Sequence, residues 1–416
     1  MKKIRDTECT YNLNRLSDDM LICIVHFLGV RDWFNFSYTC RQINSLKKMR
    51  HTHVNKYYFC SKNIKDKDLM NLPVCMLNLK FCRQITDAGV MTLNNLHALN
   101  IGSCFQLTDL SISQLQNLKI LNIESCYAIT EVGLSQLHNL QSLDISSCHS
   151  IPEDGISHLI NLKTLSIAHC YIMSDASISQ LVNLQNLDIT DCAITDTGIS
   201  HLNKLHTLSI KSCTTVTNVG IQQLQQLHSL DVSNCRHITD DGISKLHNLR
   251  ILKMNHTTLI TDDGLSKLVD LCELYMDSCY QITDRGIKKL YCLHSLNISN
   301  CINVTDDALS DLCNLKNLYM YNCLVISNKG ISNKHQLRTL DMSHNNNITD
   351  EALSKLIHLQ TLNITGCKQI TEKGIKDLHE LVSIDVSYCQ RRVKSAASGL
   401  PKIQNLEMIY EPEVCC

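Results

Sequence analysis

Cysteine is the residue type in this chain with the most capacity for chemistry, and it occurs 23 times among 416 residues. Most of the cysteines form a series in which neighbours are 22 residues apart, with one interval of 21 and two doubled ones. Such residues could ligate a metal, form disulfides, act as nucleophiles or fill buried space. The series comprises Cys60, Cys82, Cys104, Cys126, Cys148, Cys170, Cys192, Cys213, Cys235, Cys279, Cys301, Cys323, Cys367 and Cys389.

Two places in this series hold another residue, Thr257 and Asn345. Both residue types are small and form hydrogen bonds, but neither can replace a disulfide partner or a thiolate ligand. Zinc sites also need ligands clustered at short spacings, which the series lacks. We therefore interpret it as a ladder of buried thiols that fill space and donate weakly to backbone carbonyls.

The elements that position the cysteines follow from the residues around them. The repeats have the form L-x-x-L-x-I-x-x-C-x-x-I-T-D-x-G-I-x-x-L, and fifteen run from Cys82 to Cys389, with a degenerate one at Cys60. Apolar and polar residues alternate before the cysteine, which predicts a short strand, as at Leu230 and Val232. Apolar residues three apart after it predict a short helix, as at Ile243, Leu246 and Leu249.

Small residues mark the junction between strand and helix. Thr239 and Asp240 precede the predicted helix, where their side-chain oxygens can cap free amides. Two residues after this aspartate, most repeats have glycine and the other full repeats have serine or alanine. Only small residues occur there, so we expect the backbone to be closely approached at the corner between strand and helix. The glycines are Gly89, Gly133, Gly155, Gly198, Gly220, Gly242, Gly264, Gly286, Gly330 and Gly374, and the substitutes are Ser111, Ser177, Ala308 and Ala352.

One strand and one short helix in 20–29 residues is the pattern of a leucine-rich repeat. A single repeat buries too little to fold, but stacked repeats share one core. The predicted fold is α/β: a leucine-rich-repeat solenoid shaped as a horseshoe, with a parallel concave sheet and short convex helices, preceded by a small all-α domain.

The phrase C-x-x-I-T-D-x-G-I resembles the cysteine-containing leucine-rich repeats of the F-box/leucine-rich-repeat protein family. The resemblance covers about residues 57–411. Repeats in that family are commonly a few residues longer than the 22 found here, which leaves shorter convex segments in this chain.

The first fifty residues follow a different pattern. The stretch Ser-Asp-Asp at 17–19 favours the start of a helix, and the apolar residues after it fall on one face. Gly29 ends this segment, and further helical segments are expected from Asp32 and from Arg41. A bundle of this size has a weak core and often needs a partner.

This segment resembles an F-box, whose family pattern is roughly L-P-x-E-L-L-x-x-I-F-x-x-L, then x-D-L, then V-C-R-x-W. Ser17 stands where proline is usual and Ile43 where tryptophan is usual. An F-box directly before such repeats is the domain order of the family. The matching residues are Leu16, Asp19, Leu21, Ile24, Val25, Leu28, Asp32, Trp33, Cys40 and Arg41. The alternative is a helical cap over the first repeat.

The resemblance implies a non-catalytic adaptor of an SCF-type (Skp–cullin–F-box) ubiquitin ligase, located in the cytoplasm or nucleus. The F-box would dock on a Skp-type linker protein, itself bound to cullin and a RING subunit, and the repeats would hold the protein to be ubiquitinated. No catalytic residue, metal or cofactor is expected. The Skp-type protein would contact Leu16, Leu21, Ile24, Val25, Leu28 and Trp33. The alternative is a leucine-rich-repeat interaction scaffold without a role in ubiquitin ligation.

The side chains four and two residues before each ladder position should point outward from the strands. The residues that stand two positions before the ladder position are mostly small, which predicts a smooth polar surface on the concave sheet. A few outward positions carry large side chains instead. Tyrosine is enriched where proteins bind, so we expect these residues to bind the target. The alternative is that the tyrosines pack on each other across neighbouring strands. These exceptions are Lys253, Tyr275, Asp277, Tyr319 and Tyr321.

A second, acidic set occupies the same outward positions and is expected to be a solvated face. It consists of Glu124, Asp144, Asp188 and Asp231.

Composition narrows the range of partners. Lys and Arg total 39 and Asp and Glu total 40, so the net charge of −1 gives no general attraction to nucleic acid or anionic membranes. The longest apolar stretch, from Met20 to Leu28, is too short to span a bilayer, and no signal-peptide core is present. An intracellular protein with reduced thiols is therefore expected.

The expected organisation is a tail over residues 1–12, the F-box over 13–50, the repeats over 51–411 and a second tail over 412–416. The tail ends in Cys415 and Cys416. Adjacent terminal cysteines resemble the prenylation signal of small vesicle-trafficking GTPases, so membrane attachment is expected only if they are prenylated.

Overall fold

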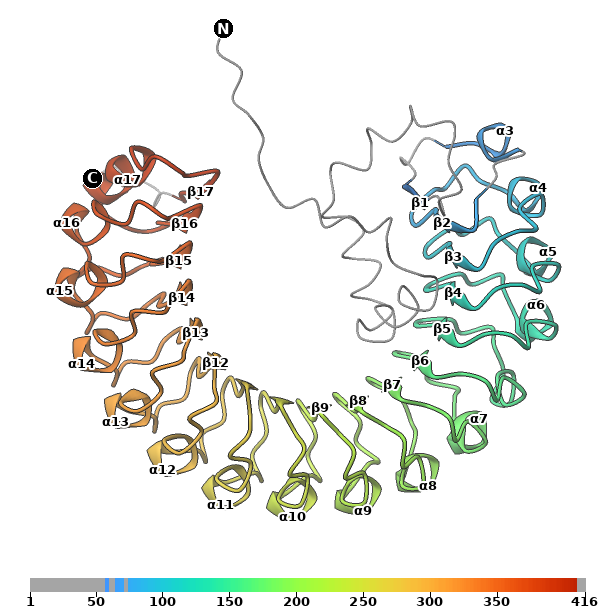
Figure 1. Cartoon of the computed structure of the whole chain (residues 1–416), viewed down its shortest axis with the longest axis horizontal. Helices are drawn as coiled ribbons and strands as arrows, with labels where there is room; N and C mark the ends of the chain where they lie inside the picture. Colours follow the sequence, from blue (N-terminus) through green and yellow to red (C-terminus); the bar gives the residue numbers. More distant parts are fainter. Residues whose placement is uncertain (1–56, 60–63, 71–73, 410–416) are drawn as a thin grey trace, which may run out of the picture. The chain divides into compact units, whose positions relative to one another are not determined.

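The computed structural model describes residues 57–59, 64–70 and 74–409. The predicted F-box, Cys60 and the terminal cysteines lie outside these residues. The chain divides into two compact units, an N-terminal unit that ends at Cys170 and a C-terminal unit that begins at Tyr171. Within each unit, strands line the inner side and helices the outer side, as in a leucine-rich-repeat solenoid (Figure 1).

The N-terminal unit contains short parallel strands in register one repeat apart, so that Met76 pairs with Ala98, and Ala98 with Ile120. Its strands are β1 (Tyr57–Phe59), β2 (Met76–Asn78), β3 (Ala98–Asn100), β4 (Ile120–Asn122), β5 (Ser142–Asp144) and β6 (Thr164–Ser166). Its helices are α3 (Asp66–Leu69), α4 (Asp87–Val90), α5 (Asp109–Ile112) and α6 (Glu131–Leu134).

The C-terminal unit follows the same parallel pattern. Its strands are β7 (Asn186–Asp188), β8 (Thr207–Ser209), β9 (Ser229–Asp231), β10 (Ile251–Lys253), β11 (Glu273–Tyr275), β12 (Ser295–Asn297), β13 (Asn317–Tyr319), β14 (Thr339–Asp341), β15 (Thr361–Asn363), β16 (Ser383–Asp385) and β17 (Asn405–Glu407). Its helices are α7 (Asp175–Ile178), α8 (Asp196–Ile199), α9 (Asn218–Ile221), α10 (Asp240–Ile243), α11 (Asp262–Leu265), α12 (Asp284–Ile287), α13 (Asp306–Leu309), α14 (Asn328–Ile331), α15 (Asp350–Leu353), α16 (Glu372–Ile375) and α17 (Arg391–Ser398).

The ladder cysteines lie in the core and donate to the backbone of the preceding repeat. Cys301 Sγ is 3.0 Å from the carbonyl oxygen of Met276, and burial raises the pKa of this thiol to about 12. Asn345 makes the same contact through Nδ2, 2.6 Å from Met320 O. Among the described residues, no ladder cysteine forms a disulfide. The series is therefore a structural ladder, as the spacing predicts.

The Thr-Asp pair does more than cap its own helix. Thr283 Oγ1 accepts from the amide of Arg285. Its backbone N–H and its hydroxyl also donate to the two carboxylate oxygens of Asp262 in the preceding repeat, at 2.9 Å and 2.6 Å. The Thr-Asp pair thus links each helix to the helix of the preceding repeat. The spacing within one repeat did not predict these bonds between repeats.

The same carboxylate explains why a small residue recurs at this position in the repeats. A Cβ added at Gly286 would lie 2.5 Å from Asp262 Oδ1 and 3.3 Å from Asp262 Cα. The predicted close approach is therefore present, but its nearest atom belongs to the side chain that binds Thr283.

One repeat departs from the expected strand-plus-helix pattern. Between β5 and β6 the chain forms turns instead of an α-helix. Pro152 occupies the place where other repeats have the capping threonine, so the repeat has no hydroxyl to bind the next free amide. Only a turn remains, closed by the Gly155 amide on Pro152 O at 3.0 Å.

Candidate protein-interaction surface

The inner side of β10–β14 carries the residues predicted to bind a target. The strand register aligns Lys253, Tyr275, Asn297, Tyr319 and Asp341 in one row, one residue per strand. Asp277 and Tyr321 follow two residues after their row members. Lys253 and Tyr275 are therefore direct neighbours, whereas Asn297 stands between Tyr275 and Tyr319. We call these strand ends the inner patch.

Tyr275 is held by contacts on both sides. The Nζ atom of Lys253 lies 5.8 Å from the centroid of the Tyr275 ring, a cation–π geometry. The Tyr275 hydroxyl donates to Glu273 Oε2 at 2.9 Å and lies 3.3 Å from Ser295 Oγ. Burial and the Glu273 carboxylate raise the pKa of the hydroxyl, so it stays neutral at physiological pH.

Tyr319 and Tyr321 have different surroundings. Tyr319 is half-buried, and burial together with the Asp341 carboxylate raises the pKa of its hydroxyl. Tyr321 is 40% exposed, and its ring meets His344 edge-on, with centroids 5.4 Å apart and planes at 82°. Tyr321 therefore packs on a histidine of the next repeat, and its other side is available to solvent.

Asp277 is engaged within the protein. Its Oδ1 atom accepts from Asn300 Nδ2 at 3.0 Å and from Ser278 Oγ at 2.9 Å. Its backbone amide donates to Asn255 Oδ1 at 2.8 Å. These bonds fix the carboxylate within the inner patch.

Sequence reasoning missed the flanking residues Glu273, Ser295 and His344. The first two stand six residues before their ladder positions, and strand alternation places that position outward too. His344 has a φ of 59°, so the backbone leaves the strand in the left-handed region just before the ladder position. A positive φ in a non-glycine residue is not evident from residue types alone.

The acidic set is not the solvated face that was expected. Asp144 is only 4% exposed, and it accepts hydrogen bonds from Asn122 Nδ2 and from the Ser146 amide. The carboxylates of Asp188 and Asp231 likewise accept from the amide two residues later, each at 2.9 Å. These aspartates close the turn at the strand end because their oxygens satisfy an otherwise unpaired amide.

A row of exposed rings lies in the N-terminal unit. Phe105 and Tyr127 stack with centroids 5.8 Å apart, and Tyr127 and His149 stack at 6.2 Å. The guanidinium of Arg83 lies 5.7 Å from the Phe105 centroid. Each residue directly follows a ladder cysteine, and the stacked faces are occupied by one another.

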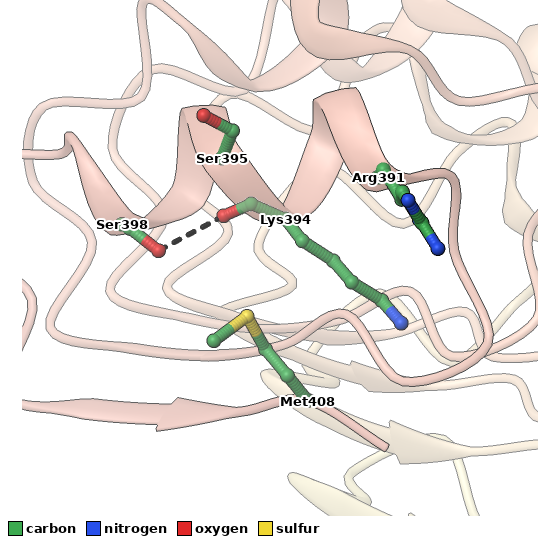
Figure 2. Close-up of a pocket in the computed structure, with 5 residues that line it drawn as sticks. All are labelled: Arg391, Lys394, Ser395, Ser398 and Met408. Atoms are coloured by element: carbon green, nitrogen blue, oxygen red, sulfur yellow. Dashed lines mark hydrogen bonds between the residues drawn. The ribbon is translucent and has the colours of Figure 1, made fainter. Parts of the chain in front are cut away.

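A pocket of about 390 Å³ lies at the end of the C-terminal unit, between α17 and the segment after β17 (Figure 2). Lys394 extends from the helix and donates through Nζ to Ile409 O at 3.0 Å. Ser398 Oγ donates to Lys394 O at 3.0 Å. The buried lysine thus ties α17 to the last strand segment. The lining residues are Arg391, Lys394, Ser395, Ser398 and Met408.

Within residues 57–59, 64–70 and 74–409, no three or more His, Cys, Asp or Glu side chains are grouped so that they could hold a metal ion. None of the helices in these ranges has the length and apolar character needed to cross a membrane.

Comparison with known families finds both predicted domain types. The F-box domain family matches residues 13–55. Leucine-rich-repeat families match residues 335–378, as two copies, and residues 180–202, 223–246 and 245–269. A comparison with curated protein sequences gives no significant match.

Solved structures with the same fold share little sequence with this chain. A leucine-rich-repeat protein of Leptospira interrogans is 21% identical, covers 82% of this chain and 94% of its own, and has a TM-score of 0.54. A chain from the yeast Rad7–Elc1 complex is 20% identical, covers 67% and 84%, and has a TM-score of 0.52. At such identities the likeness shows the fold alone. The domain matches show an F-box and leucine-rich repeats in one chain, which is the composition of an F-box/leucine-rich-repeat protein.

Proposed function

We propose that this protein is the substrate-recognition adaptor of an SCF-type ubiquitin ligase. The observation that carries the proposal is the F-box match at residues 13–55 in a chain that also contains leucine-rich repeats. One domain would join the ligase and the other would bind the target. The adaptor would act without a catalytic residue of its own, by raising the effective concentration of a target lysine near the ubiquitin thioester.

The F-box would dock on a Skp-type linker protein through its apolar residues. The proposed contacts are Leu16, Leu21, Ile24, Val25, Leu28 and Trp33. The support for this assignment is the family match and the residue pattern. The Rad7–Elc1 neighbour, a repeat protein fold found in a two-protein complex, is consistent with such docking.

The inner patch would bind the target. Five strands at about 4.8 Å spacing spread it over roughly 20 Å, which suits an extended segment of about six residues. The rings of Tyr275 and Tyr321 are already held by Lys253 and His344. Side chains held in place before binding lose less entropy on association, and tyrosine is enriched among the residues that dominate binding energy.

The test is capture of ligase subunits from eukaryotic cytosol by the intact protein and by a Leu28→Asp variant. The intact protein should capture Skp-type protein and cullin, and the variant should capture neither, because a charge in an apolar contact is left unpaired. Leu110→Asp is a matched control, since Leu110 is 61% exposed on α5. Capture of neither subunit by the intact protein would leave a repeat scaffold with a helical cap.

A further inference from the structure

One edge of the C-terminal unit carries lysine, arginine or histidine in seven of eight successive repeats. It consists of the first residue before each strand and the turn that precedes it, from residues 203–206 to residues 357–360. Asp270 is the only acidic residue within these turns. The basic residues and histidines are Lys204, His206, His228, His247, Arg250, His294, Lys316, His335, Arg338 and His358. We call this surface the basic edge.

Backbone hydrogen bonds align the basic edge. The amide of Arg250 donates to His228 O at 2.8 Å, the amide of Lys316 to His294 O at 2.8 Å, and the amide of Arg338 to Lys316 O at 2.7 Å. Each repeat therefore adds one side chain at the same place, and neighbours are about 5 Å apart. The row is a continuous feature of the fold.

The positive charges on this edge are only partly compensated. Arg250 pairs with Asp270 at 3.0 Å, and Arg338 donates to the backbone carbonyl of His358 at 2.9 Å. Lys316 and Arg338 are exposed neighbours of like charge, each directly before one of two adjacent strands, β13 and β14. Like charges in such positions destabilise a sheet, so the arrangement favours a bound anion over the free protein.

The acidic residues gather elsewhere in the same repeats. Asp240, Asp262 and Asp306 stand in the first turn of their helices and bind the threonine or serine of the next repeat. The start of a helix favours a negatively charged side chain, because its unpaired backbone N–H groups give that end a partial positive charge. These helix acids are thus held on the outer side, whereas Glu273 and Asp277 lie on the inner side beside the edge. Within the edge, four lysine and arginine residues outnumber one acid, although the whole chain has a net charge of −1.

We propose that the basic edge binds an acidic segment of a partner protein, running across the strands beside the inner patch. Tyr275 links the two surfaces, because its hydroxyl binds Glu273 and Ser295, which directly follow edge positions. Eight strands span about 34 Å, enough for an extended segment of roughly ten residues.

A protein segment fits this edge better than a nucleic acid does. Only four of its residues are lysine or arginine, namely Lys204, Arg250, Lys316 and Arg338. Binding to a phosphate backbone draws on many such contacts and on a basic surface, which this chain lacks overall. That the acidic segment belongs to the protein to be ubiquitinated rests on the proposed adaptor function.

The experiment measures binding of the full chain to a fluorescein-labelled peptide of twelve residues in which Glu and Gly alternate. Fluorescence anisotropy at low salt compares the wild type with Lys316→Glu/Arg338→Glu. The expected result is a loss of affinity of about tenfold in the variant, and loss of wild-type binding in high salt, where exposed charges are screened. A Lys/Gly peptide should not bind.

Lys288→Glu/Lys289→Glu is the matched control, because both lysines are exposed and the net charge changes equally. It should leave the affinity unchanged. Equal affinity of all three proteins for the acidic peptide, or no binding to the wild type, overturns the proposal. Tighter binding of a twelve-nucleotide single-stranded RNA with the same sensitivity to Lys316→Glu/Arg338→Glu also overturns it.

Capture of the Skp-type protein is measured on the same variants. If the edge variant still captures the Skp-type protein while the wild type ignores the acidic peptide, this inference fails and the adaptor function stands. If Leu28→Asp and wild type both fail to capture the Skp-type protein but bind the peptide, the adaptor function fails and the edge stands.

Discussion

In the interior of the repeats one set of contacts recurs along the chain, whereas on the inner patch nearly every strand presents a different side chain. The thiols of Cys301 and Cys323 both donate to a carbonyl one repeat back, at 3.0 Å. At one outward position, by contrast, the register aligns Lys253, Tyr275 and Asn297. Residues that recur in every repeat maintain the fold, whereas residues that differ between repeats can distinguish one partner from another.

Thiol reactivity gives the largest expected difference between the interior and the surface. Burial raises the pKa of Cys301 and Cys323 to about 12, whereas Cys292 and Cys313 are exposed. The thiolate is the reactive form, so at pH 8 the two buried cysteines should react at least about a hundredfold more slowly with iodoacetamide. Peptide mass spectrometry measures the rates. Equal rates would contradict a closed interior.

A branched side chain at the glycine position should disrupt the contact between repeats. Gly286→Val would force Asp262 away from Thr283, and we expect a loss of about 2 kcal/mol in the free energy of unfolding. Urea unfolding followed by circular dichroism measures it. Gly286→Ala is the control and should lose less than about 1 kcal/mol, since Ala308 and Ala352 occupy this place in other repeats. Unchanged stability of Gly286→Val would contradict the close approach of Asp262 to this position.

The inner patch should respond in the opposite way, with lost binding and a preserved fold. Tyr275→Ser/Tyr319→Ser/Tyr321→Ser should lower capture of the target about tenfold or more, because tyrosines commonly dominate binding energy. Quantitative mass spectrometry of captured proteins measures this loss. Tyr127→Ser/Tyr280→Ser removes two exposed tyrosines outside the inner patch and the basic edge and should change nothing. An unchanged list of partners in the triple variant would end the assignment.

Lys334 is an exception within the interior, since neighbouring repeats have Leu312 and Leu356 at its position. Its side chain is fully buried, and Nζ reaches Ser310 O at 3.4 Å. Burial lowers the pKa of this amine, so its charged form destabilises the folded state. Lys334→Met should therefore stabilise the protein by about 1 kcal/mol at pH 7.

The sign of the pH dependence follows from that direction. Because the folded-state pKa of Lys334 lies below the unfolded one, the unfolded chain holds more protons between the two values, and stability rises with pH there. The advantage of Lys334→Met should be larger at pH 7 than near pH 10, where the lysine loses its charge in the unfolded chain too. Urea unfolding at several pH values measures it. A constant advantage would contradict a buried charge as its cause.

Much of the fold could be predicted because the spacing of apolar residues within each single repeat indicates its secondary structure and its buried side chains. Alternation before Cys235 predicted the strand. The spacing of Ile243 and Leu246 correctly predicted that these side chains are buried, but not the length of the helix, because α10 ends at Ile243 and Leu246 lies in the turn after it. The bonds between repeats could not be predicted, because the partner of Thr283 lies 21 residues earlier and only the register reveals it. The capping helix α17 was also missed, since its sequence departs from the repeat.

For the candidate site, the sequence predicted only which side chains point outward from the strands. Strand alternation placed Tyr275 and Tyr321 outward, but not their contacts with Glu273 and His344, which depend on the register and on a positive φ. The expectation for Asp144 failed for a related reason. Its carboxylate closes a turn, and alternation alone does not show whether an outward acid is solvated or bonded.

The most direct test of the adaptor role is ubiquitin transfer in a reconstituted ligase, with Skp-type protein, cullin–RING, a ubiquitin-conjugating enzyme and a target captured by this chain. Wild-type protein should support transfer. Leu28→Asp should abolish it while still binding the target, and Tyr275→Ser/Tyr319→Ser/Tyr321→Ser should abolish it while still binding the Skp-type protein. Undiminished transfer with both variants would contradict the division of labour between F-box and repeats.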